Sequence, residues 1–161
     1  MQDTRGMKPS MQDPSTFERV SMLETRGETA ASCLGPRRLL LAEDDGPFRF
    51  LLTSALRQEG YQIVAVANGV DLMDILGDSL SPDGTFAAFD LVLSDLRMPG
   101  WPGLEALATF GQNPRMPPFI LFTAFGDEDT HKRAREIGAI TLLDKPFDID
   151  YLREIAAHVL C

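Results

Sequence analysis

The sequence has no apolar run close to the roughly 18 to 20 residues that a membrane span needs. It also has no basic N-terminal segment followed by an apolar one, which a secretory signal would require. Its two cysteines, Cys33 and Cys161, have neither the density of a disulfide scaffold nor the spacing of metal ligands. We therefore expect a cytoplasmic protein without membrane contact, in which both cysteines are incidental free thiols.

An excess of positive charge is also absent, because the net charge is −9. Nucleic-acid phosphates require a basic protein surface, so we expect no direct nucleic-acid partner. The basic cluster HKRAR at 131–135 follows the acidic DEDT and is typical of a solvated helix face. With 161 residues, of which 44% are hydrophobic and 24% charged, the chain suits one folded domain.

The first part of the chain differs in composition from the rest. Residues 1–36 are rich in Ser, Thr, Gly and Pro and show no sustained apolar period, which predicts a flexible N-terminal extension. Within it, FERVSMLE at 17–24 favours a helix too short to be stable without a docking surface. The folded domain is predicted to cover residues 37–161.

From residue 37 onward, apolar runs of strand length alternate with helical patterns in five strand–helix units. The strand-like runs cover 38–43, 61–67, 89–95, 118–124 and 139–144, and the helical patterns cover 46–60, 69–78, 103–111, 127–138 and 148–160. The first helix is predicted to turn one apolar face to the core: Phe48, Leu51, Leu52, Ala55 and Leu56. Near-continuous apolar strands separated by helices predict an α/β fold, a doubly wound five-stranded parallel sheet.

Polar residues end four of the five predicted strands. They are Glu43, Asp44 and Asp45 after the first, Asp95 at the end of the third, Thr123 and Ala124 after the fourth, and Lys145 before Pro146 after the fifth. Strand ends of a parallel sheet meet at one edge, so these groups should converge. Converging carboxylates repel one another unless a cation lies among them, and oxygen ligands favour Mg²⁺. A lysine and a hydroxyl beside that ion would suit phosphoryl transfer, with an Asp as the nucleophile.

The motifs LLLAEDD, LVLSDLRMPG, ILFTA and LLDKPF, in this order, closely resemble the receiver domain of two-component response regulators over about residues 37–161. The resemblance implies the flavodoxin-like (βα)5 fold, Asp95 as phosphoacceptor and a cis Lys145–Pro146 peptide. It implies Mg²⁺ ligands from Glu43 (through water), Asp44, Asp95 and the backbone carbonyl of Arg97. It implies phosphoryl contacts from Thr123, the Ala124 amide and Lys145.

The resemblance also implies partners. The phosphoryl group would come from a phosphohistidine on a sensor histidine kinase or a histidine phosphotransfer protein. Because the chain ends with the fifth predicted helix, we expect no effector domain and an output through a downstream protein target. Such a protein is a signalling phosphoacceptor with slow autodephosphorylation, not an enzyme with turnover.

Three positions depart from the usual receiver pattern. Leu142 stands three residues before Lys145, where relatives usually carry an aromatic switch residue, so we expect Thr123 and the loop after it to carry most of the switching. Arg97 and Phe125 would flank the phosphoryl group and shield it from water, unless both point into solvent. Trp101 would cap the loop after Asp95 or contact a partner.

Other functions fit the sequence less well. A degenerate receiver that acts only as an interaction module usually lacks the acceptor, the acids or the lysine, and all are present here. A haloacid-dehalogenase-type phosphohydrolase needs a second Asp where this chain has Arg97. A flavodoxin-type cofactor binder needs a phosphate-cradling loop where this chain has EDDGPF.

Overall fold

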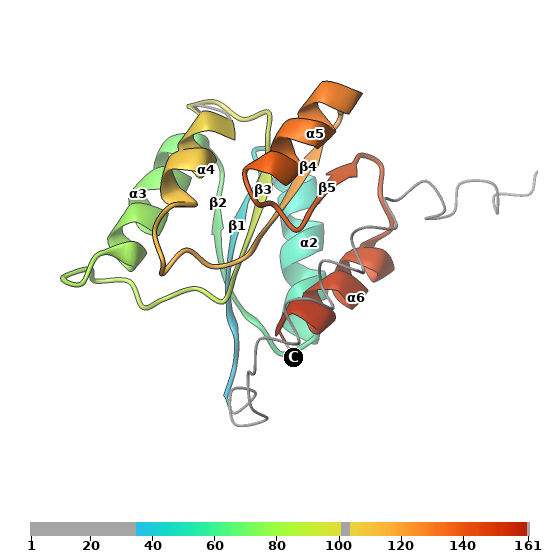
Figure 1. Cartoon of the computed structure of the whole chain (residues 1–161). Coiled ribbons are helices and arrows are strands. Elements are labelled where there is room, and N and C mark those ends of the chain that lie inside the picture. The colour runs from blue at the N-terminus through green and yellow to red at the C-terminus, as the bar shows by residue number, and fades with distance from the viewer. Residues whose placement is uncertain (1–34, 101–103, 161) are drawn as a thin grey trace, which may run out of the picture.

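The computed structural model describes residues 35–100 and 104–160, in which strands and helices alternate (Figure 1). The strands are β1 (Arg38–Ala42), β2 (Gln62–Val66), β3 (Leu91–Asp95), β4 (Phe119–Thr123) and β5 (Thr141–Asp144). The helices are α2 (Gly46–Gln58), α3 (Gly69–Leu80), α4 (Leu104–Phe110), α5 (Glu128–Glu136) and α6 (Ile149–Leu160). The predictions for residues 1–34, which include Cys33, and for Trp101 and Cys161 lie outside the described residues.

The five strands form one parallel sheet in the order β2-β1-β3-β4-β5. Helices α2 and α6 cover one face, and α3, α4 and α5 cover the other (Figure 1). Every residue of β3 and β4 is buried because both faces of the sheet are covered, which explains their continuous apolar sequence. The predicted doubly wound α/β fold is confirmed.

Each face of the sheet has its own apolar core. Leu52, Leu56 and Leu152 belong to the core under α2 and α6, while Leu72 and Leu107 belong to the core under α3, α4 and α5. None of the helices in the described part of the chain has the length and apolar character needed to cross a bilayer.

The predicted core face of α2 was wrong at one position. Leu52, Ala55 and Leu56 are buried as expected, and Phe48 is half-buried, but Leu51 is 49% exposed. Successive helical residues are about 100° apart, so Leu51 falls beyond the edge of the buried arc of α2. It lies there beside Phe50, whose side chain is 75% exposed.

Helix α2 starts at the predicted residue, Gly46, and ends at Gln58, two residues before the predicted end at Gly60. Asp45 is the N-cap and its side chain accepts a hydrogen bond from the Phe48 amide at 3.2 Å, while Pro47 lies in the first turn. After the helix, Gly60 has a φ of +92°, a left-handed conformation that glycine adopts without a steric penalty. These signals place the first turn of α2 directly after the acidic end of β1.

Candidate functional site

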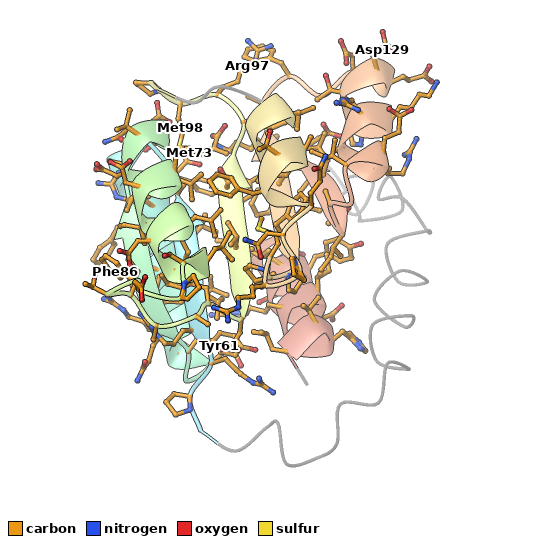
Figure 2. All side chains as sticks on the ribbon, turned by 60° about the vertical axis from the view of Figure 1, so that its left-hand side comes forward. Tyr61, Met73, Phe86, Arg97, Met98 and Asp129 are labelled. Carbon is orange, nitrogen blue, oxygen red and sulfur yellow. The ribbon has the colours of Figure 1, made fainter. Side chains whose placement is uncertain are left out.

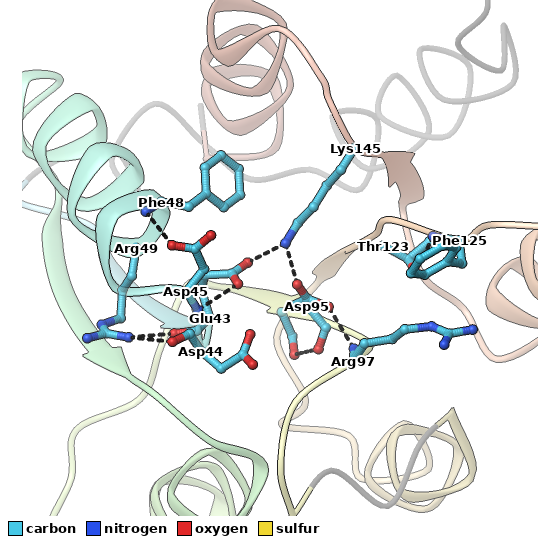
Figure 3. Close-up of polar contacts among 11 residues, drawn as sticks. Glu43, Asp44, Asp45, Phe48, Arg49, Asp95, Arg97, Thr123, Phe125 and Lys145 are labelled. Atoms are coloured by element: carbon cyan, nitrogen blue, oxygen red, sulfur yellow. Dashed lines mark hydrogen bonds and ion pairs between the residues drawn. The ribbon is translucent and has the colours of Figure 1, made fainter.

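The ends of four neighbouring strands form the candidate site (Figure 3). The register aligns Ala42 with Ser94 and Asp95 with Phe122, so β1, β3 and β4 end side by side. Strand β5 ends next to β4, because Thr123 pairs with Asp144. The polar residues that follow these strands are therefore brought to one edge, as the sequence predicted.

Three carboxylates meet at this edge. Glu43, Asp44 and Asp95 each offer an oxygen, and these oxygens all lie within 4.8 Å of one another. Glu43 is fully buried and Asp95 is 4% exposed, whereas Asp44 faces solvent. Asp45 is not part of this acidic cluster, because its side chain caps α2.

Lys145 provides the positive charge that the buried carboxylates need. Its Nζ donates to Glu43 Oε2 at 2.8 Å and forms a second, short ion pair with Asp95 Oδ2. The Lys145 amide donates to the Thr123 carbonyl at 2.8 Å, which fixes the lysine backbone at the end of β4. The Lys145–Pro146 peptide is cis, as expected.

Burial and charge pairing shift the pKa values of two of these groups. Burial raises the pKa of Glu43 to about 7, although hydrogen bonds from Lys145 and the Asp45 amide favour its charged form. Burial alone would lower the pKa of Lys145, but its hydrogen bonds to Asp95 and Glu43 outweigh that effect and raise it. Lys145 therefore stays charged at neutral pH, while Glu43 exchanges a proton there.

The loops after β3 and β4 hold Asp95 and Thr123. The Arg97 amide donates to Asp95 Oδ1 at 2.6 Å, and the Phe125 amide donates to Thr123 Oγ1 at 3.2 Å. The Arg97 guanidinium carbon lies 4.7 Å from the centre of the Phe125 ring, within cation–π distance. Phe125 is 67% exposed and Arg97 is also exposed, so the two side chains stack on each other at the surface and join the two loops.

The structure places the predicted site residues together, but the predicted role of each stays a prediction. The structure places Arg97 and Ala124 at the site but does not test metal binding by the Arg97 carbonyl or phosphoryl binding by the Ala124 amide. Leu142 is 6% exposed and packs in the core under α3, α4 and α5, paired with Leu121 in the sheet. Strand β5 carries no aromatic residue, and the role of position 142 in switching stays a prediction.

Sequence reasoning missed two residues of the first turn of α2. Arg49 Nη1 donates to the Glu43 carbonyl at 2.8 Å, and the Phe48 ring centre lies 4.8 Å from Lys145 Nζ. The apolar pattern assigned Phe48 to the core and gave Arg49 no role. One sequence signal could have indicated both residues: they follow Glu43 by no more than six positions, on a helix that starts next to the acidic residues.

The donor set fits a hard divalent cation. Its oxygens come from two buried carboxylates and one exposed one, and Lys145 already offsets part of their charge. Mg²⁺ prefers such oxygen ligands, keeps several waters and takes one or two carboxylates directly. The exposed side of the cluster, at Asp44, gives a cation and its waters access.

Comparisons with known proteins agree with this site. The family model described as "Response regulator receiver domain" matches residues 39–157. Sporulation initiation phosphotransferase F of Bacillus subtilis is 35% identical over 123 residues, which are 76% of this chain and 93% of that protein. Transcriptional regulatory protein PdtaR of Mycobacterium tuberculosis is 37% identical over 124 residues, which are 77% of this chain but only 57% of that protein. The structure of the non-phosphorylated HemR receiver domain of Leptospira biflexa has a TM-score of 0.66 and 27% identity, with 77% of this chain and 94% of that chain covered.

The raised pKa of Glu43 predicts a pH-dependent stability in metal-free buffer. Its pKa rises from 4.5 to about 7 on folding, so its contribution is complete below pH 4.5 and is lost as the pH rises through 7. In the presence of a chelator, the free energy of unfolding of the wild type should therefore fall relative to that of Glu43→Gln as the pH is raised from about 4.5 to above 7. The expected fall is on the order of 1 to 3 kcal/mol. Urea denaturation at several pH values measures this difference.

The control for that measurement is Glu154→Gln, which removes an exposed acid of α6. It should keep the pH dependence of the wild type. Parallel curves for the wild type and Glu43→Gln would contradict the raised pKa.

Proposed function

This chain belongs to the receiver domains of two-component response regulators, and from that premise we propose that it accepts a phosphoryl group on Asp95 from a protein phosphohistidine. One observation carries the proposal: the Asp95 carboxylate, 4% exposed, contacts Lys145 and lies within 4.8 Å of oxygens of Glu43 and Asp44. A single nucleophile is thus held beside both a cation and a set of candidate metal ligands.

In the proposed reaction, an Asp95 carboxylate oxygen attacks phosphorus in line with the imidazole nitrogen of the donor. An oxygen–phosphorus bond forms, the nitrogen–phosphorus bond breaks, and its electron pair stays on the imidazole. The Arg97 amide, which donates to Asp95 Oδ1, orients the carboxylate for this attack. Lys145, which contacts Asp95 Oδ2, would then pair with the phosphoryl oxygens.

Mg²⁺ is the cofactor that we propose for this site. Asp44, Asp95 and the Arg97 carbonyl would hold it directly, and Glu43 would hold it through water. When bound, the ion would supply positive charge to the phosphoryl oxygens. Thr123 and the Ala124 amide, at the end of β4, are the proposed neutral donors to those oxygens.

The surface beside the site supports a protein as the phosphoryl donor. Pro47, Phe50 and Leu51 are exposed on α2, close along the helix to Phe48 and Arg49, which contact the site. Exposed apolar side chains next to a reactive group suit a protein interface. We propose that the phosphohistidine protein, a sensor kinase or a phosphotransfer protein, contacts this stripe.

A degenerate receiver that acts only as an interaction module is the second candidate. The contacts of Lys145 with Glu43 and Asp95 argue against it, since they preserve the arrangement that phosphoryl transfer needs. Catalytic turnover as a phosphohydrolase is not proposed, because Arg97 stands where such enzymes carry a second acid.

The first prediction concerns phosphorylation itself. Incubation with acetyl phosphate and Mg²⁺ should add a labile group of about 80 Da, the mass of one phosphoryl group, to the wild type but not to Asp95→Asn. Intact-mass spectrometry measures the adduct. A wild type without it would favour the interaction module, and an equal adduct on Asp95→Asn would place the acceptor elsewhere.

The second prediction concerns the lifetime of the acyl phosphate. Arg97→Ala and Phe125→Ala each break the stacked pair that joins the two loops, so the proposed shielding predicts that each change shortens the lifetime about 2- to 5-fold. The double variant should lose the phosphoryl group no faster than the faster single variant, because each single change already breaks the pair. Phe86→Ala removes an exposed ring of the segment between α3 and β3, which lies well away from Arg97 (Figure 2), and serves as the control. Equal lifetimes for all four variants would reject the shielding role.

The third prediction separates docking from chemistry. Phe50→Ser and Leu51→Ser should slow phosphorylation by a phosphohistidine protein about fivefold or more, since important side chains at an interface centre contribute about 1 kcal/mol or more. Both variants should match the wild type with acetyl phosphate, which makes no protein contact. Equal slowing with both donors would show that the changes disturb the site and not an interface.

A further inference from the structure

We propose that Phe48 is a positioning residue whose ring holds the Lys145 ammonium at the acceptor carboxylates. The consequence for phosphoryl transfer rests on the proposed function, but the placement of Lys145 does not. Nothing in the arrangement of acids, lysine and threonine requires an aromatic residue at position 48.

The Lys145 ammonium lies between carboxylates and aromatic rings. Its Nζ is 2.8 Å from Glu43 Oε2 and 4.8 Å from the centre of the Phe48 ring, and the Phe122 ring centre is 5.6 Å away. Both ring distances are within the range of about 6 Å in which a cation is attracted to a ring face. In Figure 3 the Phe48 ring and the Asp95 carboxylate lie on different sides of the ammonium. The ring therefore occupies a side of the ammonium that the acids leave free.

The Phe48 ring is itself fixed by neighbouring rings. Phe48 meets Phe122 edge-on, with centroids 6.3 Å apart and planes at 89°, and it meets Phe147 at 5.7 Å and 69°. Phe122 and Phe147 also contact each other at 5.6 Å. The three rings come from α2, from β4 and from the segment between β5 and α6, so they tie the helix to the strand ends. Such edge contacts are favourable beyond their buried area.

The first turn of α2 is hydrogen-bonded to the residues that follow β1. The Phe48 amide donates to Asp45, the cap of α2, and the next residue, Arg49, donates to the Glu43 carbonyl. A movement of the acidic end of β1 would therefore move the ring as well. Phe48 couples the position of the ammonium to the position of Glu43.

A ring has an advantage over a third carboxylate or a water at this side of the ammonium. An ammonium on a long flexible stem is strongly hydrated and needs to be held. The attraction to a ring face is weakly directional, so Lys145 can shift from Asp95 Oδ2 to phosphoryl oxygens without leaving the ring. A leucine would fill the same space and exclude water, but it has no ring face to attract the cation.

That difference defines the test. With acetyl phosphate and Mg²⁺, Phe48→Leu should be phosphorylated about 2- to 30-fold more slowly than the wild type, which is the range of cation–π strengths from exposed to desolvated sites. Phe48→Tyr keeps the ring and should stay within about twofold of the wild type. Phe48→Met provides a second variant without a ring, should Phe48→Leu fail to fold.

Phe89→Leu is the matched control. Phe89 is 5% exposed, lies two residues before β3 and has the Arg38 guanidinium carbon 4.9 Å from its ring centre, so the same substitution removes a buried ring and a cation–π contact away from the site. Urea denaturation confirms that every variant is folded under the assay conditions. Phe89→Leu should be phosphorylated at the wild-type rate.

A second measurement reads the position of Lys145 directly. In NMR spectra without phosphodonor, the Lys145 side-chain methylene protons should be shifted upfield by the Phe48 and Phe122 rings in the wild type and in Phe48→Tyr, and clearly less so in Phe48→Leu. A wild-type rate in Phe48→Leu, or a slow rate with an unchanged Lys145 spectrum, would overturn the proposal. If the wild type accepts no phosphoryl group, the proposed function fails, while the NMR comparison still decides the placement of Lys145.

Discussion

The site depends on the Lys145 ammonium, which reaches along the edge of the sheet from the end of β5 to the carboxylates at the ends of β3 and β1. Lys145 follows β5, and its ammonium contacts Asp95 at the end of β3 and Glu43 after β1. In the order β1-β3-β4-β5 this side chain has to pass over the end of β4, and two strand spacings amount to roughly 10 Å. Two buried carboxylates without this ammonium would carry uncompensated charge, which is costly in a protein interior. The other features of the site are arranged around the path of this side chain.

Residues at the end of β4 contact both the backbone and the ammonium of Lys145. Thr123 is 1% exposed, and its carbonyl oxygen accepts a hydrogen bond from the Lys145 amide. The Phe122 ring lies within cation–π distance of the Lys145 ammonium. Phe48 closes the path from the α2 side. The lysine therefore crosses β4 with its backbone hydrogen-bonded to the strand and its ammonium against ring faces, and it meets the carboxylates at its end.

Most of the fold and the central residues of the site could be predicted because the signals for both are local. Continuous apolar runs mark strands that are covered on both faces, and a charge at the end of such a run stands out, as Asp95 does. The residue pattern alone could not rank the three adjacent acids after β1, since the choice between cap and cluster depends on the direction of each side chain, and only the family resemblance singled out Glu43 and Asp44. Asp45 became the cap and left Glu43 and Asp44 in the cluster.

The sequence could not distinguish apolar residues that fill a core from those with another task. Leu51 and Phe48 have the same apolar character, yet Leu51 lies at the surface and the Phe48 ring faces a cation. Which of them does so is set by the rotation of α2 about its axis, and this rotation follows from packing against the sheet. The stacking of Arg97 on Phe125 joins two loops that are distant in the sequence and has no periodic signal.

The replacement of the switch aromatic by Leu142 directs attention to polar links between the site and α5. Among the described residues, His131 of α5 lies 2.9 Å from Asp144, the residue before Lys145, and the Lys145 amide is bonded to Thr123. A Cβ at Gly126, in the loop after β4, would collide with the Asp144 carboxylate, so that loop and the end of β5 are in close contact. The hydrogen bond from the Lys145 amide to the Thr123 carbonyl is one route by which a displacement of Thr123 would reach Lys145. Our expectation that the loop after β4 carries the change without an aromatic residue at position 142 stays a prediction.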